Sequence, residues 1–152
     1  SAFNNHEAIP SEFTCDGGGE GFDISIGNVP ASTKSLAVII QDPDAPDPNA
    51  PRPGGFTHFV VYNVPPSIRS LSPARLPAEA KVGVNDDGQA GYQGPCPKIG
   101  RHRYVTTVYA LDATVPDLGK ARRADVLRAI KGHVIAQAEL VGTYAKQDKA
   151  AR

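Results

Sequence analysis

Four stretches of the chain have the hydrophobic pattern of extended strands. Ser35–Gln41 is a nearly continuous apolar run rich in β-branched residues, which is typical of a buried strand. Phe56–Val64 and His102–Leu111 are strand-length segments that mix apolar and polar positions. Ala136–Leu140 alternates with a period of two, so we predict a closing strand over His133–Tyr144. Alanine, glutamate and leucine in this last segment favour helix, and a longer helix is therefore the alternative.

Side-chain alternation assigns the polar residues of these strands to faces. Successive side chains of an extended strand point to opposite faces of a sheet. This rule places His58 on the same face as Val60. It places His102 and Tyr104 together on one face of their strand, and Arg103 on the other.

The segments between the strands are rich in proline and glycine. Asp42–Pro53 holds five prolines in twelve residues, which predicts a stiff, extended loop because proline fixes φ and lacks an N–H donor. Gly94–Pro97 reads GPCP and is a second rigid loop, and the first 30 residues are loop-like. A short helix is expected over Asp125–Lys131, with Gly132 just beyond its end.

Short strands, proline-rich loops and one short helix in the C-terminal half predict a mainly β fold. The architecture that suits this pattern is a two-sheet antiparallel β-sandwich. With 152 residues and no repeat or linker, the chain has the length of a single domain spanning residues 1–152.

The charge balance excludes some partners. Lysine and arginine total 16, as do aspartate and glutamate, so no overall field attracts nucleic acid, and we expect no nucleic-acid partner. No apolar stretch approaches the roughly 18 residues of a membrane span, and we expect no transmembrane segment. We find no signal sequence. A cytoplasmic location is expected, with a periplasmic or secreted one left open.

The polar residues that can carry chemistry gather where predicted strands meet rigid loops. Asp42–Pro46 follows the first strand, His58 lies near the start of the second, and Gly94–Pro97 leads to His102–Tyr104. Imidazole N–H and phenol O–H groups are donors suited to an anion, and histidines can become cationic near neutral pH. We expect Asp42 to accept a hydrogen bond from one imidazole, to fix its orientation and to favour its protonated form.

The order of these motifs resembles the phosphatidylethanolamine-binding protein family, which includes Raf kinase inhibitor protein. DPDAP at 42–46, HFVVYNVP at 58–65, and GPCP followed by HRY at 102–104 carry the resemblance, which extends from about Phe13 to Tyr144. The closing GHVIAQAELVGTY is similar to the tail of the bacterial and archaeal branch of this family.

The resemblance implies a β-sandwich with a small pocket that accepts phosphate-like or carboxylate anions. The residues that match the pocket wall are Asp42, His58, His102 and Tyr104, and those that match its rim are Gly94 and Pro95. The resemblance implies no cofactor and no metal, and it suggests a cis peptide before Pro46 and a homodimer.

These implications lead us to expect a non-catalytic binding protein rather than an enzyme. Its ligand would be phosphate, phosphoethanolamine or a carboxylate, on a phospholipid head group, nucleotide or metabolite, and its partner a protease or kinase that it inhibits or modulates. One alternative is an enzyme that uses the aspartate, two histidines and tyrosine as an acid–base site. Another is a partner-docking inhibitor that acts through the 42–53 loop.

Two segments depart from the family pattern. Asp23–Ser25 runs almost directly to Gly27–Pro30, where the family has a longer segment with a tryptophan. Gly54–Thr57 stands where the family often has a tryptophan before the strand histidine. Because the chain contains no tryptophan, we expect a less aromatic pocket mouth.

Asp44 and Arg103 are expected to form a structural ion pair, because Arg103 lies on the face opposite to the pocket residues. Two histidines and Asp42 also meet the ligand inventory of a metal site. We expect no metal, since the resemblance implies none and the chain lacks an H-x-x-x-H spacing.

The two cysteines leave two alternatives open. Cys15 and Cys96 both flank the expected pocket loops, and they either form one disulfide or remain free thiols. A disulfide would indicate an oxidising compartment or a thermophilic source. A Cys96–His102 nucleophile pair is conceivable, but a structural role for Cys96 between two prolines is the expectation.

Overall fold

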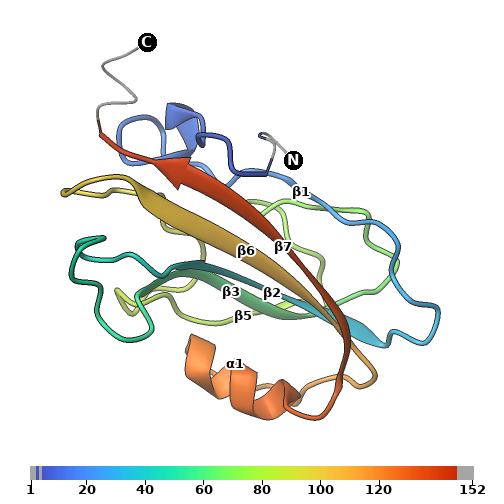
Figure 1. The fold of residues 1–152 in the computed structure, drawn as a ribbon. Helices are drawn as coiled ribbons and strands as arrows, with labels where there is room; N and C mark the ends of the chain where they lie inside the picture. Colours follow the sequence, from blue (N-terminus) through green and yellow to red (C-terminus); the bar gives the residue numbers. More distant parts are fainter. Residues whose placement is uncertain (1–2, 4, 147–152) are drawn as a thin grey trace.

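A five-stranded antiparallel sheet forms the centre of the protein (Figure 1). The computed structural model describes residue 3 and residues 5–146 of the 152-residue chain. The sheet has the order β5-β3-β2-β6-β7. Its strands are β2 (Ser35–Asp42), β3 (Phe56–Val64), β5 (Lys81–Val82), β6 (His102–Leu111) and β7 (Val134–Tyr144).

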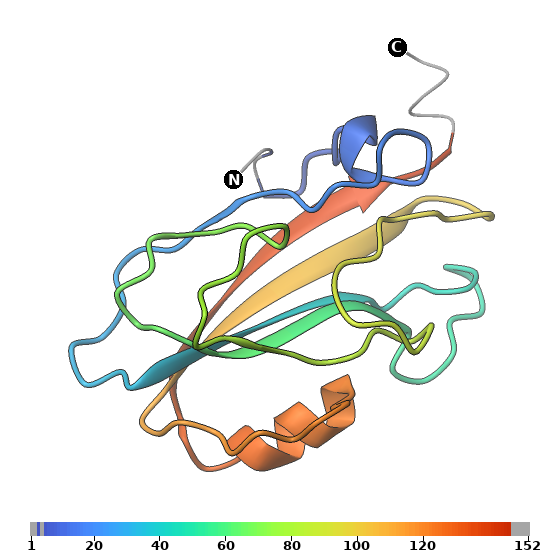
Figure 2. The ribbon, with the colours of Figure 1, turned by 180° about the vertical axis from the view of Figure 1, so that it is seen from behind.

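Smaller elements cover both faces of this sheet. The two-stranded antiparallel sheet of β1 (Ile24–Ser25) and β4 (Ser70–Leu71) belongs to the layer over one face, together with long irregular segments and a 3-10 helix at Ser11–Phe13. Helix α1 (Arg123–Ile130) covers the other face, and the view from behind in Figure 2 shows the same layering.

The predicted fold class is confirmed: the described part of the chain is mainly β, with two antiparallel sheets and one α-helix. Residues 134–144 form a strand, so the helical alternative for this segment is wrong. Pairing along the whole of β6 supplies the backbone hydrogen-bond partners that override its helix-favouring residues. The loop-like first 30 residues contain, in addition, the 3-10 helix and strand β1.

The continuous apolar run of β2 reflects burial on both faces. Leu36, Val38 and Ile40 pack into the core shared with the β1–β4 layer. Ala37 and Ile39 pack into the core beneath α1. A strand with solvent on one face would instead show the alternation of polar and apolar residues.

The pairing of β2 with β3 contains a β-bulge close to the start of β3. Ile40 lies opposite Phe59, whereas Gln41 lies opposite Thr57, so His58 is left without a partner on β2. An extra residue of this kind interrupts the regular alternation of side chains between the two faces.

The bulge overturns one of the face assignments. Val60 packs in the core beneath α1, whereas the ring of His58 lies 5.3 Å, centroid to centroid, from that of Tyr104 on the opposite face. The prediction that His58 and Val60 share a face is therefore wrong. Simple alternation fails here because the inserted residue shifts the pattern by one position.

Antiparallel pairing explains why the motif segments converge. Since β2 is antiparallel to both β3 and β6, the end of β2 lies beside the starts of β3 and β6. Asp42, His58 and His102 thus come together at one end of the sheet although they are far apart in the chain. No helix within residues 3 and 5–146 is long and apolar enough to cross a membrane.

Candidate functional site

A cavity of about 350 Å³ opens at this end of the sheet. Five of the six residues predicted for the pocket line it: Asp42, His58, Gly94, His102 and Tyr104. The sixth, Pro95, does not line the cavity. It is buried, and its carbonyl accepts a hydrogen bond from the backbone N–H of Cys15 at 3.1 Å.

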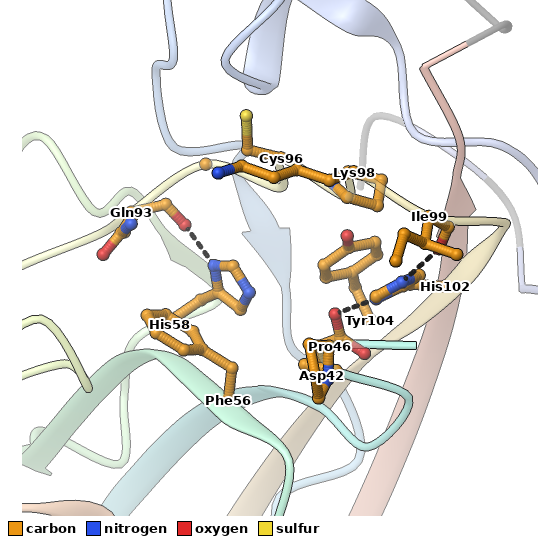
Figure 3. Close-up of a pocket in the computed structure, with 13 residues that line it drawn as sticks. Asp42, Pro46, Phe56, His58, Gln93, Cys96, Lys98, Ile99, His102 and Tyr104 are labelled. Carbon is orange, nitrogen blue, oxygen red and sulfur yellow. Dashed lines mark hydrogen bonds and ion pairs between the residues drawn. The ribbon is translucent and has the colours of Figure 1, made fainter. Parts of the chain in front are cut away.

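Asp42 and His102 form a buried pair in the cavity wall (Figure 3). His102 Nδ1 lies 2.5 Å from Asp42 Oδ2. The other carboxylate oxygen, Oδ1, accepts the backbone N–H of Asp44 at 2.8 Å. Both oxygens of Asp42 therefore have donors, as expected for a buried carboxylate.

The second nitrogen of His102 also faces an acceptor. Nε2 lies 2.8 Å from the backbone carbonyl oxygen of Ile99. A carboxylate and a carbonyl both accept, so the two contacts are satisfied together when both ring nitrogens carry hydrogen. The geometry thus favours an imidazolium at His102, whose charge offsets that of Asp42.

His58 keeps one ring nitrogen available to the cavity. Its Nδ1 donates to the backbone carbonyl of Gln93 at 2.8 Å, and Nε2 has no hydrogen-bond partner among the described residues. Figure 3 shows this ring pointing into the cavity. Burial lowers the pKa of His58, against the opposing effects of the Gln93 carbonyl and the Asp42 charge.

Tyr104 lies between the two histidines on the cavity floor. Its ring is 5.3 Å from that of His58 and 6.3 Å from that of His102, measured between centroids. Burial, and then the negative charge of Asp42, raise the pKa of Tyr104 above its ordinary value. The phenol therefore remains protonated at neutral pH.

The expected ion pair of Asp44 and Arg103 is present on the opposite side of β6. Arg103 Nη2 and Nε donate to the carboxylate at 2.8 and 3.0 Å, and the backbone N–H of Arg103 adds a third hydrogen bond at 2.8 Å. Hydrogen bonding to the guanidinium is the main cause that lowers the pKa of Asp44. The pair ties the DPDAP turn to the start of β6.

The turn itself also has the expected backbone form. The peptide bond between Ala45 and Pro46 is cis, as the family resemblance suggested. Both residues line the cavity.

Several lining residues escaped the sequence analysis. Phe56 packs against His58 with ring centroids 4.8 Å apart and supplies an aromatic wall. Ile99 and Lys98 form part of the opposite rim. Lys98 could have been found in the sequence from its position directly after GPCP. The backbone carbonyls of Gln93 and Ile99 could not, since every residue carries a carbonyl.

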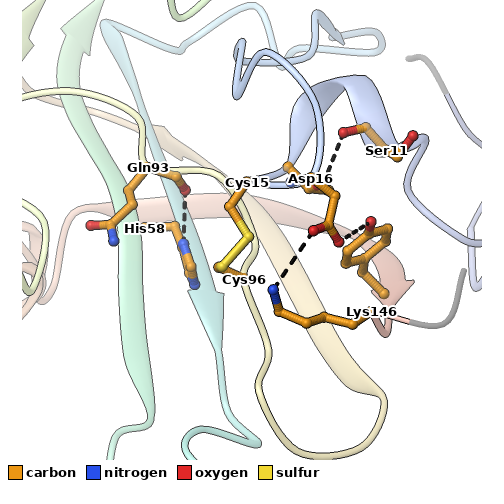
Figure 4. The surroundings of a disulfide bond; sticks show 9 residues. Ser11, Cys15, Asp16, His58, Gln93, Cys96 and Lys146 are labelled. Atoms are coloured by element: carbon orange, nitrogen blue, oxygen red, sulfur yellow. Dashed lines mark hydrogen bonds and ion pairs between the residues drawn. A yellow bond between two sulfur atoms is a disulfide. The ribbon is translucent and has the colours of Figure 1, made fainter. Parts of the chain in front are cut away.

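A disulfide joins Cys15 to Cys96 and decides between the two alternatives for the cysteines (Figure 4). It links positions separated by 81 residues. Cys96 lines the cavity, so the bridge connects the cavity rim to the segment after the 3-10 helix. As a disulfide partner Cys96 carries no free thiol, and the Cys96–His102 nucleophile pair is absent.

Gly94 lets these two segments approach closely. A Cβ atom at this position would lie 2.9 Å from the carbonyl oxygen of Phe13 and 3.1 Å from Cα of Thr14. Only glycine avoids this overlap, so Gly94 shapes the rim by backbone packing.

The cavity does not have the ligand set of a metal centre. Over residues 3 and 5–146, no group of three or more histidine, cysteine, aspartate or glutamate side chains is placed to hold a metal ion. Asp42 and His102 engage each other, and the nitrogen of His58 that faces the cavity has no second ligand beside it.

Comparison with known proteins gives one family. The family model described as phosphatidylethanolamine-binding protein matches residues 1–145. A protein of Methanothermobacter thermautotrophicus named UPF0098 is 45% identical over 149 residues, and the alignment covers 94% of each chain. A protein of the same name from Chlamydia muridarum is 38% identical over 143 residues and is covered to the same extent, 94% of each chain.

Two crystal structures are similar over nearly the whole chain. A putative phosphatidylethanolamine-binding protein homologue from Chlamydia trachomatis superposes with a TM-score of 0.89 at 38% identity, covering 96% of this chain and 94% of that one. YbcL of E. coli, described as a member of the mammalian family, gives a TM-score of 0.82 at 30% identity, covering 93% and 92%. The sequence motifs, the fold and these matches agree, and the chain belongs to the phosphatidylethanolamine-binding protein family, with relatives in bacteria and archaea.

Proposed function

We propose that this protein is a non-catalytic binding protein that holds a small anion, phosphate or carboxylate, in the cavity between β2, β3 and β6. One observation carries the proposal. A single unpartnered imidazole nitrogen, Nε2 of His58, faces a cavity whose carboxylate, Asp42, is already offset by His102. Nε2 is an acceptor in the neutral ring and a donor once the ring is protonated. An anion that binds together with a proton therefore meets a donor without meeting an uncompensated negative charge.

The charges around the cavity support an anionic ligand. Asp42 and His102 together contribute about zero net charge when both ring nitrogens of His102 carry hydrogen. Lys98 lines the rim, is exposed, and forms no ion pair with any described residue. Within residues 3 and 5–146, its ammonium group is thus the one uncompensated charge among the lining side chains, and it favours an anion over a cation.

The walls support a ligand that is more than a bare ion. Phe56, Ile99 and Pro46 present apolar surface beside the polar floor. This combination suits a phosphate or carboxylate carried on a small organic body, such as a phospholipid head group, a nucleotide or a metabolite. For free phosphate, which uses the floor alone, we expect a Kd of roughly 1 mM to 1 μM.

The site is organised before a ligand arrives. The two imidazoles are oriented by the carbonyls of Gln93 and Ile99, and the surrounding loops are rich in proline. Little side-chain entropy is lost when such a site binds. We propose that the biological output is modulation of a protease or kinase partner, or carriage of the ligand. The Cys15–Cys96 disulfide favours the periplasmic or secreted location, or a thermophilic source, over a reducing cytoplasm.

Titration with inorganic phosphate, followed by NMR of the histidine rings, tests the proposal. The ring signals of His58 should move with saturation, and those of His102 should follow through the shared cavity. In His58→Ala the ring signals of His102 should no longer move with phosphate. Lys98→Gln should weaken phosphate binding by about twofold to fivefold. Lys34→Gln is the matched control, because exposed Lys34 precedes the opposite end of β2.

Histidine signals that stay still at tens of millimolar phosphate would refute the proposed site. An enzymatic role is tested separately by screening small phosphate and carboxylate esters for turnover. Hydrolysis or rearrangement that disappears in His58→Ala would replace the binding function by an acid–base one. We expect no turnover, because both nitrogens of His102 already have partners, leaving His58 without a second histidine to exchange protons.

A further inference from the structure

The disulfide occupies an exposed position on the cavity rim. Cys15 and Cys96 are both exposed to solvent, and Cys96 lines the cavity. Figure 4 shows the bridge close to the Gln93–His58 contact. Exposed disulfides are more open to thiol–disulfide exchange than buried structural ones.

The chain on the N-terminal side of Cys96 is held without the disulfide. The backbone N–H of Gln93 donates to the carbonyl of His58 at 2.9 Å. The hydroxyl of Tyr92 donates to the carbonyl of Phe13 at 2.8 Å. The Cys15 N–H to Pro95 carbonyl bond, which is independent of the sulfur atoms, also remains.

The chain on the C-terminal side of Cys96 has much less support. Residues 96–100 make no backbone–backbone hydrogen bond with the described part of the chain. Pro97 is buried, and the carbonyl of Ile99 meets His102. Gly100, at the far end of the segment, also lies against Pro48. Apart from these contacts, the covalent bond through Cys96 is the main restraint on residues 97–99.

This weakly supported segment carries two groups that the proposed site uses. Lys98 supplies the uncompensated positive charge, and the Ile99 carbonyl accepts from His102 Nε2. Figure 3 shows both residues on the rim above the two histidines. Release of the segment would leave the charge of Lys98 less well placed and would weaken the support of the His102 ring.

We propose that the redox state of the Cys15–Cys96 bridge controls the affinity of the cavity for its anion. The inference rests on the proposed function. A dithiol reductant attacks one sulfur, and its second thiol closes to complete the exchange. Two electrons and two protons pass to the protein, which gains two thiols, while the reductant becomes a disulfide. Reduction frees residues 96–100 and lowers affinity, and oxidation restores it.

Phosphate titration of the oxidised and the dithiothreitol-reduced protein, with ring and amide NMR, tests this inference. We expect reduction to weaken phosphate binding by about twofold to tenfold. The His58 ring stays in place, but the ammonium group of Lys98 is no longer held at the rim. Amide hydrogens of residues 96–100 should exchange faster in the reduced protein, and that of Gln93 should not. Removal of the reductant with reoxidation should restore the original affinity.

The double variant Cys15→Ser/Cys96→Ser provides the matched control. It should bind phosphate like the reduced protein and should not respond to dithiothreitol. Equal affinities of the oxidised and reduced forms, with reduction verified by mass and folding by circular dichroism, would overturn the redox inference alone. Failure of the oxidised protein to bind phosphate would overturn the proposed function and this inference with it.

Discussion

At the scale of single residues, the cavity depends on how donors and acceptors are shared among three side chains. His102 has acceptors at both nitrogens and Asp42 has donors at both oxygens, whereas His58 has a partner among the described residues at only one nitrogen. Asp42 and His102, whose hydrogen-bonding atoms all have partners, form the floor of the cavity. The free ring nitrogen of His58 remains available to a ligand. The residues thus have different roles although all of them line one cavity.

Replacing Asp42 with asparagine tests the buried pair. Asp42→Asn removes the charge that offsets His102, and an uncompensated buried charge typically costs about 3 kcal/mol or more in stability. We expect a loss of that size in urea unfolding. Exposed Asp87 provides the control, because Asp87→Asn should change stability by no more than about 0.5 kcal/mol. Equal effects of both variants would contradict the role of the pair.

The pH dependence of stability tests His58. Burial lowers its pKa in the folded protein, so below about pH 6.5 the unfolded chain binds a proton that the folded protein does not. Stability should therefore fall as pH drops through this value toward the lower folded pKa. His58→Gln should flatten the plot of unfolding free energy against pH between pH 7 and 5. Saturating phosphate should flatten the same plot for the native protein. Identical slopes for the native protein and the variant would refute this linkage.

At the scale of elements, the β2–β3 junction positions the site. The bulge at His58 turns this side chain from the α1 side of the sheet to the cavity side. The chain returns to β3 through Gly54 and Gly55, both with positive φ, at 79° and 58°. Gly55 passes so close to β2 that a Cβ atom there would lie 1.9 Å from the carbonyl oxygen of Asp42.

A pair of alanine substitutions separates this close approach from backbone strain alone. Gly54→Ala places its Cβ in open space. Only the left-handed backbone conformation should therefore lower the free energy of unfolding, by about 1 kcal/mol. In Gly55→Ala the Cβ also overlaps the carbonyl oxygen of Asp42, so the free energy of unfolding should fall by about 3 kcal/mol or more. Only Gly55→Ala should also weaken phosphate binding, as measured by the same NMR titration. Equal losses in both variants would contradict the proposed contact.

At the scale of the whole molecule, distant segments of the chain close around the site. The disulfide spans 81 positions. The hydroxyl of Tyr144, at the end of β7, donates to Asp16 at 2.7 Å beside the bridge. An isolated parallel bridge pairs Ala8 with Thr143. The N-terminal segment is thereby held between the last strand and the cavity rim.

Removing the disulfide should lower global stability as well as anion affinity. For a closed loop of this length, the chain-entropy model gives about 4.5 kcal/mol of stabilisation at 25 °C. Cys15→Ser/Cys96→Ser should therefore shift the urea midpoint downward by a corresponding amount under oxidising conditions. The native protein should show the same shift once reduced. An unchanged midpoint would mean that the remaining contacts of the first 20 residues close the chain without the bridge.

The four long strands, the fold class and most of the pocket residues could be predicted from the sequence and the family resemblance. These are local properties, because β2, β3 and β6 each show their apolar pattern within ten residues or fewer. The motifs DPDAP and HRY likewise stand at strand ends in the sequence, where loops place functional side chains. Asp42, His58, His102, Tyr104 and Gly94 could therefore be named before any coordinates.

The direction of His58, the pairing of the cysteines and the partners of the imidazoles depend on tertiary contacts and could not be predicted from the sequence. A bulge depends on the register between two strands, and strand register is a relation between segments that neither contains alone. The acceptors of His58 and His102 are backbone carbonyls, which every residue possesses. Which carbonyl meets which ring follows from packing across the molecule, and so does the approach of Cys15 to Cys96.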